Sequence, residues 1–260
     1  MPTVVVTGAS MGIGRALALA WAARGATVVL AARGKTALEG VAEEVARAGG
    51  RALVVAGDVT DDAYRAELVA RATAEAGGID VLVNNAGRGY YAPTLMIDVE
   101  RMRTLFELNV YAPLRLVQLA GPQLEQARGT VVMMSSIAGV VAAPQYGAYA
   151  ASKFALEALS MAMRSELAAR HIRVVVVRPG PVDTPFRANA HRAPKLAGYD
   201  APDPNAQSAE DVARLTLRAV DRASPVVETS AYVRLASTTS RLAPAALRFA
   251  LRRMASRRVS

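Results

Sequence analysis

Short apolar runs of strand length alternate along this chain with amphipathic stretches of helical length, and this alternation constrains the fold more than any other feature. We predict strands at residues 3–7, 27–32, 51–56, 80–84, 130–135 and 172–178, and helices at 11–24, 35–48, 61–76, 99–126 and 147–170. Runs that are apolar throughout require cover on both faces of a sheet, and helices between the strands favour parallel pairing. The predicted fold class is therefore α/β, with a doubly wound, mostly parallel sheet in a single domain.

The chain departs from this rhythm between residues 179 and 207, where six prolines interrupt every periodic pattern. Because a long irregular loop in a compact domain usually carries a function, we expect 179–207 to form a lid over a substrate. A helix at 208–222 and a final strand at 225–233 are predicted to follow. We therefore place one catalytic domain at 1–233 and a separate tail at 234–260.

Composition excludes several kinds of site. The chain has no cysteine, and therefore no disulfide, thiolate nucleophile or thiolate zinc site. With only two histidines, His171 and His191, we expect no metal centre, although carboxylates could still hold magnesium. The N-terminus opens on a strand-like run rather than a secretory signal, and no apolar stretch reaches the roughly 20 residues that span a bilayer. We expect a cytoplasmic protein.

The positive charge of the chain is concentrated at its C-terminal end. The net charge is +9, and seven arginines but no acidic residue follow Glu228. These are Arg234, Arg241, Arg248, Arg252, Arg253, Arg257 and Arg258. The rest of the chain carries only +2, which argues against a domain built to bind nucleic acid.

The tail also has an apolar stripe at helical spacing, formed by Leu247, Ala250, Leu251 and Met254. One alternative is that this stripe packs against its own subunit or a neighbouring one near the substrate entrance. The other is that the helix lies on an anionic membrane surface, with its arginines beside the headgroups, and contacts the membrane peripherally. The sequence leaves both alternatives open.

Three glycines shape the turn between the first predicted strand and the first predicted helix. Glycine lets the backbone approach phosphate groups closely, and a helix N-terminus offers unpaired N–H groups with a partial positive charge. We therefore expect the pyrophosphate of a dinucleotide at this turn of a Rossmann-type fold. The expected contacts are Gly8, Ser10, Gly12, Ile13 and Gly14. The spacing G-x-x-x-G-x-G differs from the common G-x-G-x-x-G, and glycines also serve turns that bind nothing.

Four further motifs follow the glycine turn in order. Asn84-Asn85-Ala86-Gly87 ends the fourth strand, Asn109 lies in the next helix, Ser136 follows the fifth strand, and Tyr149-Ala-Ala-Ser-Lys153 lies on the helix after it. Together these motifs make the chain resemble the classical short-chain dehydrogenases/reductases from residue 3 to about residue 185. The resemblance implies a catalytic group of Asn109, Ser136, Tyr149 and Lys153, and a homodimer or homotetramer.

The roles of these four residues follow partly from chemistry and partly from the resemblance. Tyr149 and Lys153 are four residues apart on a helix, so they share one face. A nearby ammonium favours the phenolate, which lets the tyrosine exchange a proton with a substrate oxygen at neutral pH. The resemblance implies that Ser136 hydrogen-bonds this oxygen, that Lys153, beside Tyr149, also contacts the cofactor through the nicotinamide ribose, and that Asn109 orders a water of a proton relay.

Two residues compete with these assignments, and Asn109 has an alternative structural role. Tyr146 is seven residues from Lys153, about 10 Å along a helix axis and too far for direct coupling. Ser135 neighbours Ser136, but adjacent strand residues face opposite sides, and the family spacing of thirteen residues before the tyrosine selects Ser136. An asparagine such as Asn109 also caps or kinks helices without any catalytic role.

The end of the second predicted strand determines the choice of cofactor. A carboxylate at this place would bind the ribose of NAD and repel the phosphate of NADP. The sequence Leu30-Ala-Ala-Arg33 has no acid there, and an arginine pairs well with a phosphate, so we predict NADP, with NAD as the less favoured cofactor. An ordinary surface arginine is the alternative, and Met11 stands where NADP-preferring relatives often have a second basic residue.

Further cofactor contacts follow from the resemblance. Asp58 and Val59 match an adenine contact, although an aspartate there would also cap a helix. Asn85, Ala86 and Gly87 would flank the adenosine ribose, whereas Asn84 is expected to tie strands together. The Pro-Gly segment after the sixth predicted strand matches a family motif that holds the carboxamide of the nicotinamide. Turn chemistry alone would also explain a Pro-Gly pair there. The expected contacts of this segment are Pro179, Gly180, Val182 and Thr184.

The function predicted from the sequence is NADP-dependent hydride transfer to or from a small carbonyl or alcohol substrate. Phe186, Leu196 and Tyr199 in the predicted lid favour an apolar substrate. A regulator that binds NADP(H) without turnover is the alternative, although such a regulator has no need of a phenol beside a lysine. A third hypothesis is an interaction protein that binds nucleic acid or a membrane surface through its tail.

Overall fold

The computed structural model describes residues 1–193, 196, 203 and 206–259, and its centre is a seven-stranded parallel sheet. The strand order is β3-β2-β1-β4-β6-β7-β9. The strands are β1 (Thr3–Thr7), β2 (Thr27–Ala32), β3 (Arg51–Ala56), β4 (Val81–Asn84), β6 (Thr130–Met134), β7 (Arg173–Arg178) and β9 (Val226–Glu228). The chain reverses its direction of growth between β1 and β4, and in such folds ligands bind in the crevice at the carboxyl ends of the strands there. The predicted α/β class and parallel sheet are confirmed.

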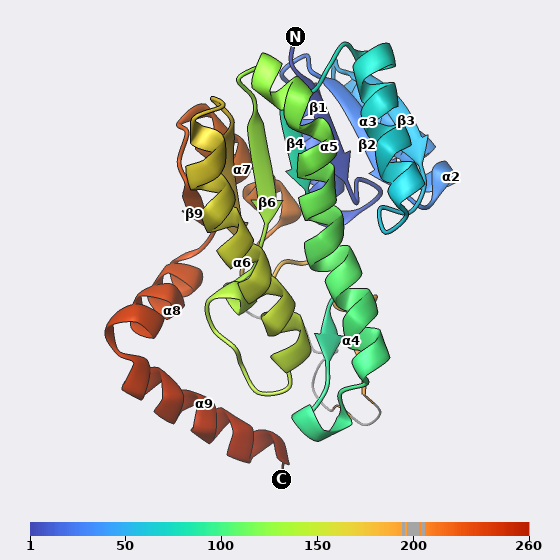
Figure 1. Cartoon of the computed structure of the whole chain (residues 1–260). Helices are drawn as coiled ribbons and strands as arrows, with labels where there is room; N and C mark the ends of the chain where they lie inside the picture. Colours follow the sequence, from blue (N-terminus) through green and yellow to red (C-terminus); the bar gives the residue numbers. More distant parts are fainter. Residues whose placement is uncertain (194–195, 197–202, 204–205, 260) are drawn as a thin grey trace.

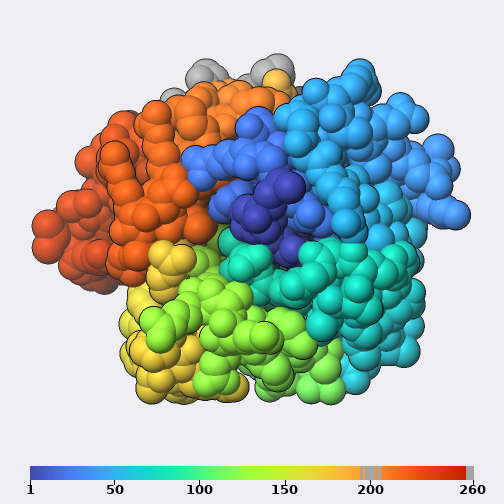
Figure 2. Space-filling model, turned by 90° about the horizontal axis from the view of Figure 1, so that it is seen from above, coloured from blue at the N-terminus to red at the C-terminus, as the bar shows by residue number. Residues whose placement is uncertain are grey.

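Helices cover both faces of the sheet (Figures 1 and 2). One face carries α1 (Gly12–Ala22), α2 (Lys35–Arg47) and α7 (Ala209–Asp221). The other carries α3 (Asp62–Ala76), α5 (Ala112–Gln126) and α6 (Gly147–Ala168). In Figure 2 the dark blue N-terminal residues lie between blue and orange segments on one side and teal, green and yellow segments on the other.

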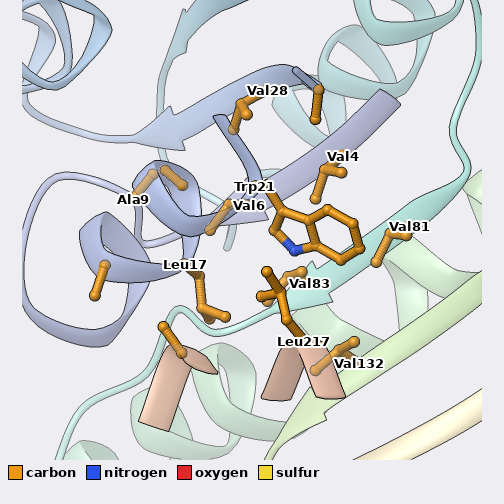
Figure 3. Packing of buried hydrophobic residues seen from close by; sticks show 14 of the residues in the cluster. Val4, Val6, Ala9, Leu17, Trp21, Val28, Val81, Val83, Val132 and Leu217 are labelled. Atoms are coloured by element: carbon orange, nitrogen blue, oxygen red, sulfur yellow. The ribbon is translucent and has the colours of Figure 1, made fainter. Parts of the chain in front are cut away.

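Each face of the sheet has its own hydrophobic cluster. Figure 3 shows Trp21 of α1 among Val4, Val83 and Leu217, which come from two strands and from α7. The indole is 5% exposed and the other three side chains are 3% exposed or less. Burying an aromatic ring among aliphatic side chains contributes roughly 1.5–3 kcal/mol, so this contact holds α1 and α7 against the sheet.

The predicted helix at 99–126 consists of three parts. It begins as α4 (Val99–Phe106), widens to a π-helical turn at Glu107–Tyr111, and continues as α5. Asp98 caps α4 by accepting the backbone N–H groups of Glu100 and Arg101. A π-turn inside a helix frequently marks a functional position, and this one contains Asn109.

The C-terminal region differs from the prediction. The strand expected at 225–233 is only β9 (Val226–Glu228), and a helix, α8 (Ala231–Leu242), begins at once because Ser230 accepts the N–H of Val233 and caps it. The predicted domain boundary at 233 therefore falls inside α8. A last helix, α9 (Pro244–Val259), runs outward below the body of the molecule (Figure 1). Of the helices that the structure describes, none has the length and hydropathy of a membrane span.

The two ends of the predicted lid are tied together. Val182 and Gln207 form a parallel bridge, and Asp183 N donates to Gln207 O at 3.0 Å. Within the segment, β8 (His191–Arg192) pairs with β5 (Tyr90–Tyr91), which follows β4. Tyr199, predicted to line the lid, lies outside the described residues.

Candidate active site

The turn from β1 to α1 requires glycine at all three predicted positions. Gly8 and Gly12 have φ angles of +66° and +54°, in the left-handed region that other residues rarely adopt. A Cβ at Gly14 would collide with the carbonyl oxygen of Gly8. The backbone is therefore shaped for a close approach to another group, and it places the start of α1 beside the end of β4.

The N-terminus of α1 is open to a ligand. In the described part of the chain, no side chain caps this helix, because Met11 at the N-cap has no acceptor for its first N–H groups. Ser10 and Ile13 are half-buried beside it. A helix N-terminus with free N–H groups and glycines that leave space for a ligand fits the phosphates of a dinucleotide.

The residues predicted to hold the far end of the cofactor lie at neighbouring strand ends. Arg33 follows β2, is exposed, and has no hydrogen bond or ion pair among the described residues. Asp58 follows β3 and accepts hydrogen bonds from Thr60 N and Oγ1 at 2.9 and 2.8 Å. Burial alone would raise the pKa of Asp58, but these bonds and the charges of Arg33 and Arg88 outweigh it and lower the pKa. Val59 is buried beside this carboxylate.

The predicted Asn-Asn-Ala-Gly motif joins β4 to the glycine turn. Asn85 Nδ2 donates to Thr7 O at 2.9 Å, and both Asn85 N and Ala86 N donate to Thr7 Oγ1 at 3.0 Å. Asn84 is buried and donates toward Pro113 O at 3.4 Å, so it ties β4 to α5 rather than to a ligand. Gly87 lies beside Asn109 and Lys153, where a Cβ would be 3.2 Å from Asn109 Oδ1.

Ser136 and Tyr149 meet at the end of β6. Ser136 begins a short turn at Ile137–Gly139, and its Oγ accepts the N–H of Ala138 at 3.1 Å and hydrogen-bonds the Tyr149 hydroxyl. The Oγ of the competing Ser135 lies beside Gly139, and this buried oxygen has no hydrogen-bond partner in the described part. The structure therefore brings Ser136, and not Ser135, to the tyrosine.

Aromatic rings surround Tyr149. Its ring centroid is 6.2 Å from that of Tyr91 and 5.9 Å from that of Phe186, and Tyr91 in turn packs on Tyr146 at 4.7 Å. Leu196 packs against the same cluster. Burial raises the pKa of the Tyr149 phenol to about 12, although the bond from Ser136 acts in the opposite direction. By itself, this environment keeps the phenol protonated.

Lys153 places a positively charged group beside the Tyr149 phenol. It follows Tyr149 by one helical turn on α6, its Nζ lies 5.9 Å from the Tyr149 ring centroid, and it donates to Met134 O at 2.8 Å. Burial lowers the pKa of this ammonium to about 8. Near neutral pH the site therefore holds a protonated phenol beside a charged but easily deprotonated lysine.

Asn109 lies in the π-turn with all its polar atoms engaged. Its Oδ1 accepts from Arg88 N at 3.0 Å, and its Nδ2 donates to Arg88 O at 3.0 Å and to Ser152 Oγ at 3.1 Å. Ser152 Oγ donates in turn to Tyr149 O. Asn109 thus connects the loop after β4 to the helix that carries Tyr149 and Lys153.

The predicted Pro-Gly motif lies against the glycine turn. Pro179 O accepts from Ile137 N at 2.8 Å, next to Ser136. A Cβ at Gly12 would be 3.1 Å from Thr184 Cγ2, and one at Gly180 would be 3.1 Å from Val233 Cγ2 of α8. Val182 is half-buried against the hydrophobic cluster on the face of the sheet that α1, α2 and α7 cover. The predicted site residues therefore lie at or beside the carboxyl ends of β1, β2, β3, β4, β6 and β7.

The structure adds residues to the site that the sequence did not single out. Tyr91 lies against Tyr149, and Arg88 Nη1 lies 3.0 Å from His191 Nε2. Burial, followed by the charges of Arg88 and Arg101, lowers the pKa of His191. Arg88 directly follows the Asn-Asn-Ala-Gly motif, and this position is the feature of the sequence that could have indicated a place in the site. No pattern linked it to His191.

Comparison with known proteins identifies a matching family and similar relatives. The family model described as short chain dehydrogenase matches residues 2–195. An uncharacterized oxidoreductase of Methylorubrum extorquens is 40% identical over 181 residues, which span 69% of this chain and 73% of that protein. The 1-deoxy-11-beta-hydroxypentalenate dehydrogenase of Streptomyces exfoliatus is 37% identical over 220 residues, 83% of this chain and 78% of that protein.

One solved structure is similar over almost the whole length. A short-chain dehydrogenase from Sphingobium yanoikuyae, in complex with NADPH, has a TM-score of 0.80 and 29% identity. The match covers 89% of each chain.

Proposed function

This chain belongs to the short-chain dehydrogenase/reductase family and is an oxidoreductase that uses a nicotinamide cofactor, and from that premise we propose an NADP-dependent enzyme. The proposed reaction moves a hydride between the nicotinamide and the carbon of a ketone, aldehyde or secondary alcohol. The observation that carries the proposal is the grouping of Ser136 and the Lys153 ammonium beside the Tyr149 phenol, with Lys153 Nζ 5.9 Å from the ring centroid. A protein that only bound the cofactor would have no use for this arrangement.

We assign the cofactor-binding residues from the contacts described above. The open N-terminus of α1 and the backbone of Gly8, Gly12 and Ile13 would hold the pyrophosphate, with Ser10 beside it. Arg33, exposed and unpaired among the described residues, would pair with the phosphate of NADP. When bound, the cofactor donates or accepts the hydride. Asp58 and Val59, the Asn85 to Gly87 backbone and the motif from Pro179 to Thr184 would complete the site.

The protein residues manage the proton. In reduction, Ser136 Oγ donates a hydrogen bond to the substrate oxygen and Tyr149 donates its proton to the same oxygen. The Lys153 ammonium stabilises the phenolate that remains, which a buried phenol with a raised pKa requires. Asn109 holds the loop and α6 at a fixed distance, and we keep the proposal that it orders a water for proton exchange.

The substrate is proposed to be apolar. Tyr91, Tyr146, Phe186 and Leu196 form a hydrophobic cluster with Tyr149. A ring or branched apolar group beside the carbonyl would pack against these surfaces. A panel of aromatic, alicyclic and linear ketones, aldehydes and acyl thioesters, followed by NADPH absorbance, tests this. Turnover of none of them would favour the alternative, a regulator that binds NADP(H) without turnover.

We also propose that the enzyme forms a homodimer or homotetramer, as its family commonly does. Apolar side chains on α6 support this, since Phe154 and Met161 are 44% and 67% exposed, as does Tyr111 at 54% before α5. A second copy of the chain would cover them. Light scattering coupled to gel filtration measures the state, and a mass of one chain would contradict the proposal.

The C-terminal arm, residues 231–259, is proposed to contact an anionic membrane surface. Leu235, Leu242 and Phe249 are 69%, 81% and 68% exposed, and the arm carries arginines without any acidic residue. Leu247 and Leu251 of the predicted stripe are half-buried, so part of the stripe packs within the protein. Exposed apolar groups among arginines suit shallow insertion beside acidic headgroups. The cytoplasmic location expected from the sequence stays a prediction.

A further inference from the structure

Arg178, the last residue of β7, joins three elements behind the site. Its Nε and Nη2 donate to Glu157 Oε1 and Oε2 of α6 at 2.9 and 2.8 Å, and its Nη1 donates to Glu228 Oε1 of β9 at 3.2 Å. The side chains of Arg178, Glu157 and Glu228 are 8%, 14% and 20% exposed. One guanidinium thus pairs with two carboxylates, so these three side chains together carry one excess negative charge.

The Glu157 carboxylate lies one helical turn beyond Lys153. Residues four apart on a helix share a face, so Lys153 and Glu157 point to the same side of α6. The turn at Ile137–Gly139 packs against this side of α6, because a Cβ at Gly139 would be 2.9 Å from Glu157 Cγ and 3.2 Å from the backbone oxygen of Lys153. Glu157 is therefore next to both the turn that presents Ser136 and the catalytic lysine.

Few other charged groups surround Lys153 and Glu157 in the described part of the chain. On α6, Arg164 is a further titratable group whose charge interacts with the cluster, while β7 contributes Arg178 and β9 contributes Glu228. The end of β6 offers Lys153 only a carbonyl, and the π-turn offers Asn109, which is uncharged. Burial lowers the pKa of Lys153, and the negative charge of Glu157 is what opposes this lowering.

We propose that Glu157, clamped by Arg178, is a positioning residue that supplies the countercharge of the Lys153 ammonium and so keeps the lysine able to act on Tyr149. The inference rests on the proposed function, in which Lys153 must carry its charge. Arg178 holds the carboxylate in place by two parallel bonds, and Glu228 offsets the positive charge that Arg178 itself brings toward Lys153. Glu157 touches neither the substrate nor the cofactor. It acts through Lys153.

The chain allows a direct test because it has only three lysines, Lys35, Lys153 and Lys195. Protein labelled with 13C at the lysine Cε gives three NMR signals, and the signal missing from Lys153→Met assigns the catalytic one. In Glu157→Gln, the pKa of Lys153 is expected to fall by about one pH unit, the lower end of the effect of a nearby opposite charge. Glu166→Gln, an exposed position on the same helix, is the matched control and should leave it unchanged.

The outcomes separate the proposal from a packing role. Thermal unfolding first establishes that Glu157→Gln is folded, and a wild-type titration of Lys153 in the folded variant would overturn the proposal. If Glu157→Gln does not fold, Glu157→Asp takes its place. Aspartate keeps the charge but retracts it by one methylene, so Lys153 should titrate below wild type, and no such lowering would again contradict the proposal.

Kinetics gives a second readout. The alkaline fall of kcat/KM should move to lower pH in Glu157→Gln by the same interval as the lysine titration, whereas a structural role would lower the rate by one factor at every pH. Glu157→Asp should restore part of the shift. The NMR titration uses the unliganded protein and needs no turnover. An absence of carbonyl reduction in the wild type would therefore refute the proposed function, and an unmoved lysine would refute only this inference.

Discussion

Gly14 of α1 faces the side chain of Asn85 so closely that a Cβ would lie 2.6 Å from the amide nitrogen. That nitrogen donates to Thr7 O at 2.9 Å and Gly8 O at 3.3 Å. One amide therefore fixes the end of β4 to the cofactor turn. The turn keeps its shape only while residue 14 has no side chain.

Gly14→Ala is accordingly expected to destabilise the protein by at least about 1–3 kcal/mol, the cost of overpacking a closed site, and to remove NADPH binding. Thermal unfolding and quenching of NADPH fluorescence measure the two effects. Gly40→Ala is the matched control, because a Cβ at Gly40, inside α2, would meet no atom within 4 Å. It should stabilise the helix by about 0.5–1 kcal/mol and leave binding intact. Equal effects of the two substitutions would refute the assigned role of the turn.

Arg33→Ala should weaken NADPH binding by roughly 10- to 100-fold, the value of a charge-assisted pair with a phosphate, and change NADH binding little. Calorimetric titration with both cofactors measures this. Lys35→Ala, another exposed cation two residues further on, serves as the control and should change neither affinity. Equal losses for NADPH and NADH in Arg33→Ala would mean that the arginine does not read the phosphate.

The pH dependence of reduction should follow Lys153. Since burial lowers the pKa of this ammonium to about 8, the lysine loses its charge at a lower pH than an ordinary lysine does. With it goes the charge that stabilises the Tyr149 phenolate. The value of kcat/KM for reduction is therefore expected to be level near neutral pH and to fall above about pH 8. A profile that stays level until about pH 10.4, where a free lysine titrates, would contradict this.

The sequence predicted the architecture because its strands are apolar throughout and its helices are amphipathic over many residues. It failed at residues 225–233, where valines, a threonine and a tyrosine favour a strand. The structure has only three strand residues there, because Ser230 caps a helix and Val233 is buried at the start of α8. A local hydrogen bond and a tertiary contact outweighed the intrinsic preference. The π-turn around Asn109 was equally invisible, since the residues on both sides continue one helical pattern.

The site shows a similar division. Tyr149, Lys153, Ser136 and the glycines were found because they have fixed spacings along the chain. The Arg178 cluster and the Tyr91 ring had no such signal, because their partners come from other elements and the pairs form only when α6, β7 and β9 are packed. Whether a charged residue is buried depends on that packing, and spacing alone does not predict it.

The protein is expected to co-sediment with vesicles that contain phosphatidylserine and not with neutral vesicles, less so at high salt. Cutting the chain at the predicted boundary would remove most of α8, which packs on Gly180, so the truncation is placed after Leu242 and removes α9 alone. This variant should keep its turnover and lose vesicle binding. Binding that survives the truncation would mean that α9 does not carry the membrane contact, and no binding at low salt would leave packing within the oligomer as the role of the arm.

The central claim is that Tyr149 transfers the proton. Tyr149→Phe removes only the hydroxyl that hydrogen-bonds Ser136, so NADPH binding should be retained while kcat falls by at least ~10²-fold, the scale of general acid-base catalysis. Tyr146→Phe, three residues earlier and packed on Tyr91, is the matched control and should stay within a few-fold of wild type. The decisive measurement is the turnover of NADPH by both variants with the best carbonyl substrate. A large loss in Tyr149→Phe alone is the expected result, and near wild-type turnover in that variant would contradict the account.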